Sequence, residues 1–225
     1  MKRGLVIAVD GPSGVGKTTI SRLLAERLGF RHVNTGSMYR ALALAADSAG
    51  VDLESDAALE RFCATASVCC DASTEKISVN GKDYTPYVRT QRAGELASVA
   101  SARAPVREFL LAVQRKAGEG GGVVMEGRDI GTVVFPDADL KVFLDASHKV
   151  RARRRHLELK GEFASGEVSA EMEERDRRDT GRRNAPLKMA EDALYVDTGL
   201  LSIDEVVRLI LNDIRERLGI GDIRS

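Results

Sequence analysis

Residues 5–24 read LVIAVDGPSGVGKTTISRLL, and this stretch decides the fold. It opens with a short apolar run over 5–9, which predicts a strand buried on both faces of a sheet. It closes with Ile20, Leu23 and Leu24 at the spacing of one helical face, so a helix is predicted over 19–28. The turn between them matches the phosphate-loop pattern G-x-x-x-x-G-K-[ST] in full. Strand, loop and helix together predict a site for the phosphates of a nucleotide.

The chemistry of this loop follows from its residue types. Glycines let the backbone wrap closely, so consecutive N–H groups point at phosphate oxygens, and the following helix adds the positive end of its dipole. Lys17 can reach the β- and γ-phosphates, and the Thr18 hydroxyl can bind Mg²⁺. The motif therefore predicts a nucleoside triphosphate with Mg²⁺. The predicted binding residues are Gly11, Pro12, Ser13, Gly14, Val15, Gly16, Lys17, Thr18 and Thr19.

The loop does not say what is done with the nucleotide. The sequence has no N-K-x-D motif, which argues against a GTPase switch. It has no H-R-D or D-F-G motif either, which argues against a protein kinase. The second substrate must therefore be inferred from other residues.

Outward from the loop, short apolar runs alternate with helical patterns. Gly29 is placed to end the first helix, and Ser202 with Glu205 forms a capping-box pattern at the start of the last one, which runs to about 218. The alternation predicts an α/β fold, a doubly wound parallel sheet with helices on both faces. The further strands are expected at 32–34, 123–125, 140–144 and 194–196, with a second helix over about 37–49.

Two regions interrupt the alternation. Residues 66–88 contain two short β-like runs around Asn80 and Gly81, a strong signal for a two-residue hairpin turn, so a small antiparallel insert is predicted. Residues 149–183 are rich in arginine and poor in apolar residues. We expect that region to form a mobile helical flap.

Composition limits the class of protein. The chain has 225 residues, equal numbers of basic and acidic side chains (34 each) and 43% hydrophobic residues, as in a globular domain. The balanced charge and the scarcity of aromatic residues (4%) argue against nucleic acid as a partner. No apolar run is long enough to span a membrane. The spacing of Cys63, Cys69 and Cys70 fits neither a disulfide framework nor a zinc site, so a cytoplasmic location is expected.

Arginines cluster in two places beyond the loop. One cluster fills four of the five positions 151–155, and the other holds Arg175, Arg177, Arg178, Arg182 and Arg183, interleaved with Asp176 and Asp179. A run of charges can simply be a solvated face. Alternatively, the rigid guanidinium fork suits phosphate oxygens, and phosphoryl transfer needs several such groups around the migrating charge. Arg128 and Asp129 follow a predicted strand and so lie at the sheet edge where such folds bind ligands.

Four segments resemble those of the bacterial cytidylate kinases, and the resemblance runs from about residue 5 to 215. The run at 126–138 is the one specific to that family, whereas the phosphate loop is shared with other small-molecule kinases. The insert around Asn80-Gly81 also matches. The segments are NTGSMYRAL at 34–42, EGRDIGTVVFPDA at 126–138, FLDAS at 143–147 and RDRRD at 175–179.

The resemblance implies transfer of the γ-phosphoryl group of ATP to CMP or dCMP. We expect the protein to be a monomer with small molecules as its partners. The resemblance also implies a discontinuous core over 1–36, 104–148 and 184–225, an acceptor-binding domain over 37–103, and a lid with its following helix over 149–183. Lys17, Arg128 and the lid residues Arg151, Arg154 and Arg155 would act on the phosphates. The acceptor would be held by Thr35, Tyr39, Arg40, Ser98, Arg107, Arg128, Asp129, Arg175, Arg178, Asp179 and Arg182.

The sequence departs from the family pattern twice. Asn34 stands where the family often has an aspartate, so any acidic role there is lost. The segment 180–184, TGRRN, also differs, which bears on the role of Arg182.

The residue chemistry supports cytosine as the base. A carboxylate such as Asp129 accepts from the N4 amine of cytosine, whereas uracil presents an acceptor oxygen at that position. A salt bridge or a helix cap is an equally ordinary role for Asp129. Asp10 and Asp145, at predicted strand ends, either hold metal-bound waters or cap their strands.

Two other functions remain open on the sequence. One is a P-loop kinase for another small acceptor, such as UMP, AMP or shikimate. The other is a nucleotide-dependent binding module, in which the arginine clusters hold RNA or a protein and the loop serves as a switch.

Overall fold

The structure, a computed structural model, describes residues 4–71, 74–159 and 164–219. The chain divides into two compact units. Met1–Phe30 and Gly121–Ser225 form the first unit, and Arg31–Gly120 form the second. The finer division into core, acceptor-binding domain and lid stays a prediction.

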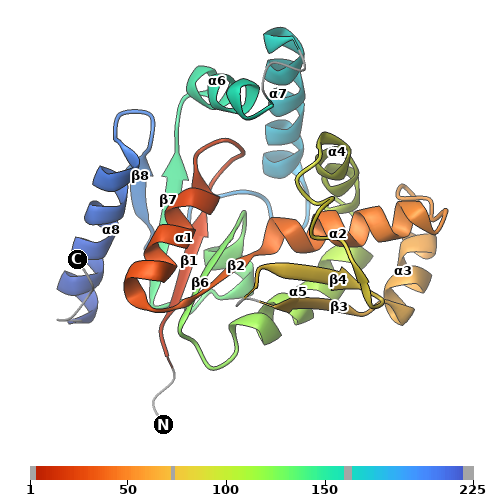
Figure 1. The fold of residues 1–225 in the computed structure, drawn as a ribbon, viewed down its shortest axis with the longest axis horizontal. Coiled ribbons are helices and arrows are strands. Elements are labelled where there is room, and N and C mark those ends of the chain that lie inside the picture. The colour runs from red at the N-terminus through yellow and green to blue at the C-terminus, as the bar shows by residue number, and fades with distance from the viewer. Residues whose placement is uncertain (1–3, 72–73, 160–163, 220–225) are drawn as a thin grey trace. The chain divides into compact units, whose positions relative to one another are not determined.

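A five-stranded sheet has the strand order β2-β6-β1-β7-β8 (Figure 1). Strand β1 pairs in parallel with β6 and β7, and β7 pairs in parallel with β8. This confirms the predicted α/β class and its five-stranded parallel sheet. Every predicted strand is present, displaced or lengthened by one or two residues. The strands are β1 (Val6–Asp10), β2 (Arg31–Asn34), β6 (Val123–Gly127), β7 (Leu140–Asp145) and β8 (Leu194–Asp197).

The helices of the first unit begin and end where local sequence chemistry dictates. Helix α1 starts two residues earlier than predicted, at Lys17, and stops at Gly29, whose left-handed φ of 67° suits a residue without a side chain. Ser202 and Glu205 form the predicted capping box of α8. The helices are α1 (Lys17–Leu28), α6 (His148–Glu158), α7 (Ser165–Gly181) and α8 (Ile203–Leu218), with a π-helical turn η1 (Ile130–Val134).

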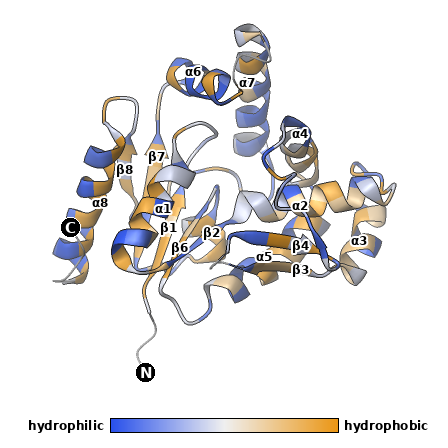
Figure 2. Cartoon of the chain, viewed as in Figure 1, coloured by the Kyte–Doolittle hydropathy of each residue, from blue (hydrophilic) through white to orange (hydrophobic). Residues whose placement is uncertain are grey.

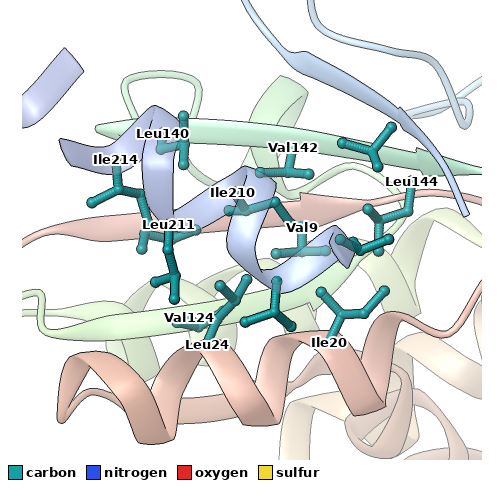
Figure 3. Packing of buried hydrophobic residues seen from close by; sticks show 14 of the residues in the cluster. Val9, Ile20, Leu24, Val124, Leu140, Val142, Leu144, Ile210, Leu211 and Ile214 are labelled. Atoms are coloured by element: carbon teal, nitrogen blue, oxygen red, sulfur yellow. The ribbon is translucent and has the colours of Figure 1, made fainter. Parts of the chain in front are cut away.

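The core of this unit lies between the sheet and two helices. Figure 3 shows Ile20 and Leu24 of α1 and Ile210 of α8 against the side chains of the sheet, all within one buried cluster. In Figure 2, β1 is hydrophobic up to its last residue, Asp10, whereas α8 carries both hydrophobic and hydrophilic residues. Residues of β1 are fully enclosed, as expected for a central strand of a covered parallel sheet. The core therefore fixes the end of β1, from which the phosphate loop departs.

The second unit contains the predicted β insert. Strands β3 (Val68–Asp71), β4 (Lys76–Val79) and β5 (Lys82–Asp83) form an antiparallel sheet in that order. Asn80 and Gly81 join β4 to β5 with positive φ angles of 52° and 79°, which a type I′ turn requires, so the hairpin prediction is confirmed.

The helices of the second unit pack in pairs, α2 against α4 and α3 against α5. Helix α2 begins two residues before the predicted start, because the Asn34 side chain caps it by accepting from Ser37 N at 3.0 Å. The sequence patterns had predicted only the first of the four helices. They are α2 (Thr35–Ser48), α3 (Asp56–Thr65), α4 (Gln91–Ala100) and α5 (Ala104–Gly118).

Helices α6 and α7 fill the arginine-rich region, so its predicted helical character is confirmed, while its mobility stays a prediction. Residues 160–163 of that region lie outside the described residues. Cys63, Cys69 and Cys70 are free thiols. Among the described residues, no helix has the length and apolar character needed to cross a membrane. The same part of the chain holds no cluster of three or more His, Cys, Asp or Glu side chains suited to a metal ion.

Candidate active site

The phosphate loop connects the buried end of β1 to the first turn of α1. Gly11 has a φ of 149°, and a Cβ there would lie 2.1 Å from the carbonyl oxygen of Leu144 on β7. Only glycine lets the loop leave the sheet so close to the neighbouring strand. Gly16, with φ 88°, precedes α1, so the amide groups at the start of this helix are available to an anion.

Lys17 is held inside the loop. Its Nζ donates to the carbonyl oxygens of Gly11 at 2.9 Å and Pro12 at 2.6 Å, and the side chain is buried. Burial lowers the pKa of Lys17 well below its usual value, and the nearby Arg128 cation lowers it further. A buried ammonium next to another cation gains strongly from an anion between the two, as the phosphates of a nucleotide would provide.

Thr18 contacts a carboxylate that the sequence patterns had not singled out. Its hydroxyl donates to Glu126 Oε2 at 3.1 Å, and Glu126 is buried near the end of β6. Strand β6 pairs with β1, which brings Glu126 beside the loop although 108 residues separate it from Thr18. The signal that could have found it is a carboxylate at the end of an apolar strand. A hydroxyl and a carboxylate are the oxygen ligands that Mg²⁺ prefers, directly or through water.

Cations gather beyond the end of β6 around one buried aspartate. Arg128 Nε donates to Asp179 Oδ2 at 2.8 Å, and both side chains are largely buried. Burial alone would raise the pKa of Asp179, but Arg128, Arg175 and Arg182 outweigh it and lower that pKa. Burial, followed by repulsion from Arg128, lowers the pKa of Arg175 to about 10. Asp179 therefore organises a compact set of guanidinium groups with excess positive charge.

The predicted base-reading carboxylate Asp129 belongs to the same group of residues. It is buried, and Arg182 lies between it and Asp179, with Arg182 Nη2 3.9 Å from Asp129 Oδ1 and Nη1 3.5 Å from Asp179 Oδ1. Arg182 Nε also donates to the carbonyl oxygen of Ala185 at 2.6 Å. Arg178 Nε lies 3.3 Å from Glu174 Oε1, one turn earlier on α7.

The three lid arginines of α6 have different surroundings. Arg151 is buried and donates to the carbonyl oxygens of Ala146 at 3.0 Å and Ser13 at 3.2 Å, and to Asp176 at 2.6 Å. Arg154 binds the hydroxyl and the carbonyl of Thr198, at 3.0 and 2.7 Å. Arg155 is partly exposed and pairs with Glu158. Two of the three therefore contact protein groups around the phosphate loop.

The second unit contributes a separate group of predicted acceptor residues. The guanidinium carbon of Arg107 lies 5.7 Å from the centre of the Tyr39 ring, and Arg107 also donates to the carbonyl of Ser101 at 3.3 Å. The Ser98 hydroxyl is buried and has no hydrogen-bond partner among the residues that the structure describes. Arg40 donates to Ser37 Oγ at 3.3 Å. Tyr39, Arg40 and the buried Thr35 lie on α2, Ser98 on α4 and Arg107 on α5.

The two strand-end aspartates differ. Asp145 Oδ1 accepts from the amide of Ala146 at 2.8 Å, which caps its strand. Asp10 accepts from two amides of η1, those of Ile130 at 2.9 Å and Gly131 at 2.8 Å. Both carboxylates thus accept from backbone amides, but Asp145 caps its own strand whereas Asp10 holds a segment that is distant in the sequence.

A phosphate loop at the carboxyl end of a central parallel strand, with buried cations beside it, defines a P-loop nucleotide-binding protein. Solved structures share this fold. An uncharacterised protein from Eubacterium ventriosum superposes with a TM-score of 0.55 at 12% identity, covering 96% of this chain and 100% of that one. A gluconokinase from Sinorhizobium meliloti gives a TM-score of 0.50 at 16% identity, covering 97% of each chain.

The chain belongs to the cytidylate kinase family, whose family model matches residues 7–216. A cytidylate kinase from Citrifermentans bemidjiense is 48% identical over 98% of this chain and 97% of that protein. One from Geobacillus kaustophilus is 43% identical over 97% of this chain and 100% of that protein. The resemblance seen in the sequence is thereby confirmed.

Proposed function

We propose that this protein transfers the γ-phosphoryl group of ATP to CMP or dCMP, which yields ADP and CDP or dCDP. The observation that carries the proposal is the group of the buried Lys17 and the partly buried Arg128 and Arg175, in which burial first, and repulsion by Arg128 second, lower the pKa of Lys17 and Arg175. Such a group needs anions, and membership of the cytidylate kinase family supports CMP as the source of one of them.

The donor side of the reaction uses the phosphate loop. We assign Gly11–Thr18 and Thr19 to the triphosphate, whose oxygens the loop amides and Lys17 would bind. Thr18 and the adjacent Glu126 fit a Mg²⁺ ion, because they offer a hydroxyl and a carboxylate oxygen 3.1 Å apart. When bound, Mg²⁺ neutralises charge that develops on the transferred phosphoryl group.

The residues of the acceptor side are assigned from the family resemblance. We assign Arg40 and Arg128 to the CMP phosphate, Asp129, Ser98 and Arg107 to cytosine, and Tyr39 and Thr35 to the surrounding wall. The buried hydroxyl of Ser98, which has no partner within the described part of the chain, supports the assignment of Ser98, because such a polar group gains a hydrogen bond from a ligand. Arg175, Arg178, Asp179 and Arg182 are assigned to the ribose and base.

The reaction needs no general base. The second pKa of a phosphate monoester is about 6, so the CMP phosphate is already largely dianionic near neutral pH. One of its oxygens attacks the γ-phosphorus, and the bond to the β–γ bridging oxygen breaks as ADP leaves. The residues supply position and positive charge, and closure of Arg151, Arg154 and Arg155 over ATP would exclude water.

The proposal extends to the setting of the enzyme. We infer a cytoplasmic monomer that acts on small molecules and not on nucleic acid. The zero formal net charge supports the inference that nucleic acid is not a partner, because bulk attraction to a polyanion is then weak. Sedimentation of the purified chain tests whether it is a monomer, and sedimentation with RNA added tests whether it binds nucleic acid.

An acceptor panel tests the proposed function. ADP release is measured with ATP, Mg²⁺ and each of CMP, dCMP, UMP, AMP and shikimate. We expect release with CMP or dCMP, with UMP at least about tenfold poorer because uracil presents the acceptor O4 to Asp129 where cytosine presents its N4 amine. Preference for AMP or shikimate would favour another small-molecule kinase. ATP binding with no acceptor-dependent release would favour a nucleotide-dependent binding module.

Lys17→Ala tests the loop's role in that reaction. Removing the ammonium should lower turnover by at least about 100-fold, because it contributes to charge stabilisation in the transition state. Lys82→Ala, an exposed lysine on β5, is the matched control and should retain wild-type turnover. Circular dichroism checks that both variants fold. Normal turnover by Lys17→Ala would contradict the assignment.

A further inference from the structure

The segment that carries Arg128 and Asp129 is anchored by a side chain from another strand. Asp10 is the last residue of β1 and is only 5% exposed. Its Oδ1 accepts from Ile130 N at 2.9 Å and its Oδ2 accepts from Gly131 N at 2.8 Å. Both oxygens of one carboxylate therefore hold the two residues that directly follow Asp129.

These two amides open the turn η1 and would otherwise lack a partner. The first amides of a helical turn have no acceptor within the turn, and a side chain at the preceding position often supplies one. Here the preceding residue is Asp129, a good capping residue, yet its side chain makes no capping bond. The remote Asp10 does the capping, so the Asp129 carboxylate is not used for that purpose.

The strand itself does not need this side chain. The backbone of Asp10 is already in register with Gly127 on β6 and Phe143 on β7. Burial raises the pKa of Asp10 to about 6, even though the two amides and Lys17 act to lower it. A buried carboxylate at this position is costly, and what it holds is the backbone beside Asp129.

We propose that Asp10 is a positioning residue for the acceptor: its two hydrogen bonds fix the start of η1, and thereby aim Arg128 and Asp129 at the nucleotide. The inference rests on the proposed function. According to this proposal, Asp10 contacts neither substrate and acts through the backbone of residues 128–131.

Asp10→Asn is the test variant, because it keeps the shape and replaces one acceptor oxygen by an NH₂ group that faces an amide N–H. We expect KM for CMP to rise at least about tenfold, the size of a lost charged hydrogen bond, while KM for ATP stays within about twofold. The preference for CMP over UMP should narrow, as it should in Asp129→Asn.

Asp139→Asn is the matched control. Asp139 Oδ2 accepts from Val6 N at 2.7 Å, so the same substitution removes a carboxylate bonded to the other end of the same strand. It should leave both KM values and the base preference unchanged. A purely structural role for Asp10 predicts instead that the two variants behave alike, or that KM for ATP and CMP rise together.

Hydrogen exchange supplies a readout besides activity. In Asp10→Asn the amides of Ile130 and Gly131 should exchange faster than in wild type, and those of β6 should not. Asp10→Glu, which displaces both oxygens, should show the same selective loss and serves if the first variant fails to fold. Unchanged KM for CMP in a folded variant overturns the inference alone. No CMP turnover by the wild type overturns the proposed function and the inference with it.

Discussion

At the scale of single residues, the charge of Asp10 should make stability depend on pH. The pKa of Asp10 is raised by burial from 3.8 to about 6, so the folded chain holds this proton more tightly than the unfolded chain does. Protonation of Asp10 therefore stabilises the folded chain. This contribution is fully present below about pH 4 and is lost as the pH rises through 6. The shift corresponds to about 3 kcal/mol.

Asp10→Asn checks this sign, because asparagine does not titrate. We expect the free energy of unfolding of the variant, relative to wild type, to increase by up to about 3 kcal/mol between pH 4 and pH 7. Urea denaturation at a series of pH values measures it. Asp139→Asn controls for the substitution itself. A difference between variant and wild type that does not change with pH would contradict the raised pKa.

Single residues also show what the sequence could and could not reveal. Lys17 and Thr18 were predictable because their motif is contiguous, and Arg128 with Asp129 because the strand before them is clear. Glu126 and Asp10 acquire their partners through strand pairing, 108 and 120 residues away in the chain. No local pattern encodes such contacts, so only the fold could supply them.

At the scale of secondary structure elements, the loop after β8 and helix α6 brace the phosphate loop. The hydroxyl of Thr198 lies 3.0 Å from the carbonyl oxygen of Val15 and 3.1 Å from that of Asp145, and it accepts from Arg154. Thr198 is buried, so these bonds are shielded from water. Part of the arginine-rich region thus supports the loop rather than standing as a solvated face.

Thr198→Val tests the role of these hydrogen bonds, because valine keeps the shape of the side chain and removes its hydroxyl. Loss of about 1 kcal/mol of hydrogen bonding to the loop should raise KM for ATP by roughly fivefold and leave KM for CMP nearly unchanged. Thr198→Ser should restore KM for ATP. Ser202→Ala, which removes the cap of α8 at a similar cost in stability, is the control and should not alter KM for ATP. Equal effects of the two substitutions would show that Thr198 acts through stability alone.

Elements differed in how predictable they were. Strands of the parallel sheet were found because burial on both faces makes them short apolar runs, and the β4–β5 hairpin because Asn80-Gly81 has a strong turn preference. Helices α3, α4 and α5 were not predicted, since their buried faces are short or contain small and polar residues. Helix α3 buries Leu59 and Cys63, α4 buries mainly alanines, and α5 buries Arg107 and Gln114 among its apolar residues. The turn η1 follows a five-residue strand without any helical period, and a carboxylate outside its own sequence holds it.

At the scale of the whole molecule, the residues assigned to ATP and those assigned to CMP are distributed differently over the two units. Every residue assigned to ATP lies in the first unit, whereas the residues assigned to CMP come from both, with Ser98 and Arg107 in the second. Hydrogen exchange with mass spectrometry distinguishes these distributions. A non-hydrolysable ATP analogue with Mg²⁺ should slow exchange in the phosphate loop and α1, and leave α4 and α5 unchanged.

CMP alone should slow exchange in both units, at η1 and α7 in the first and at α4 and α5 in the second, because ligand binding suppresses the local opening of every segment that it contacts. Lys17→Ala should abolish the effect of the ATP analogue and keep that of CMP, which separates the two sites in one variant. Protection by CMP in one unit only would remove the other unit's residues from the acceptor site. The assignment of Ser98 and Arg107 to cytosine would then fail, even if CMP proved to be the substrate.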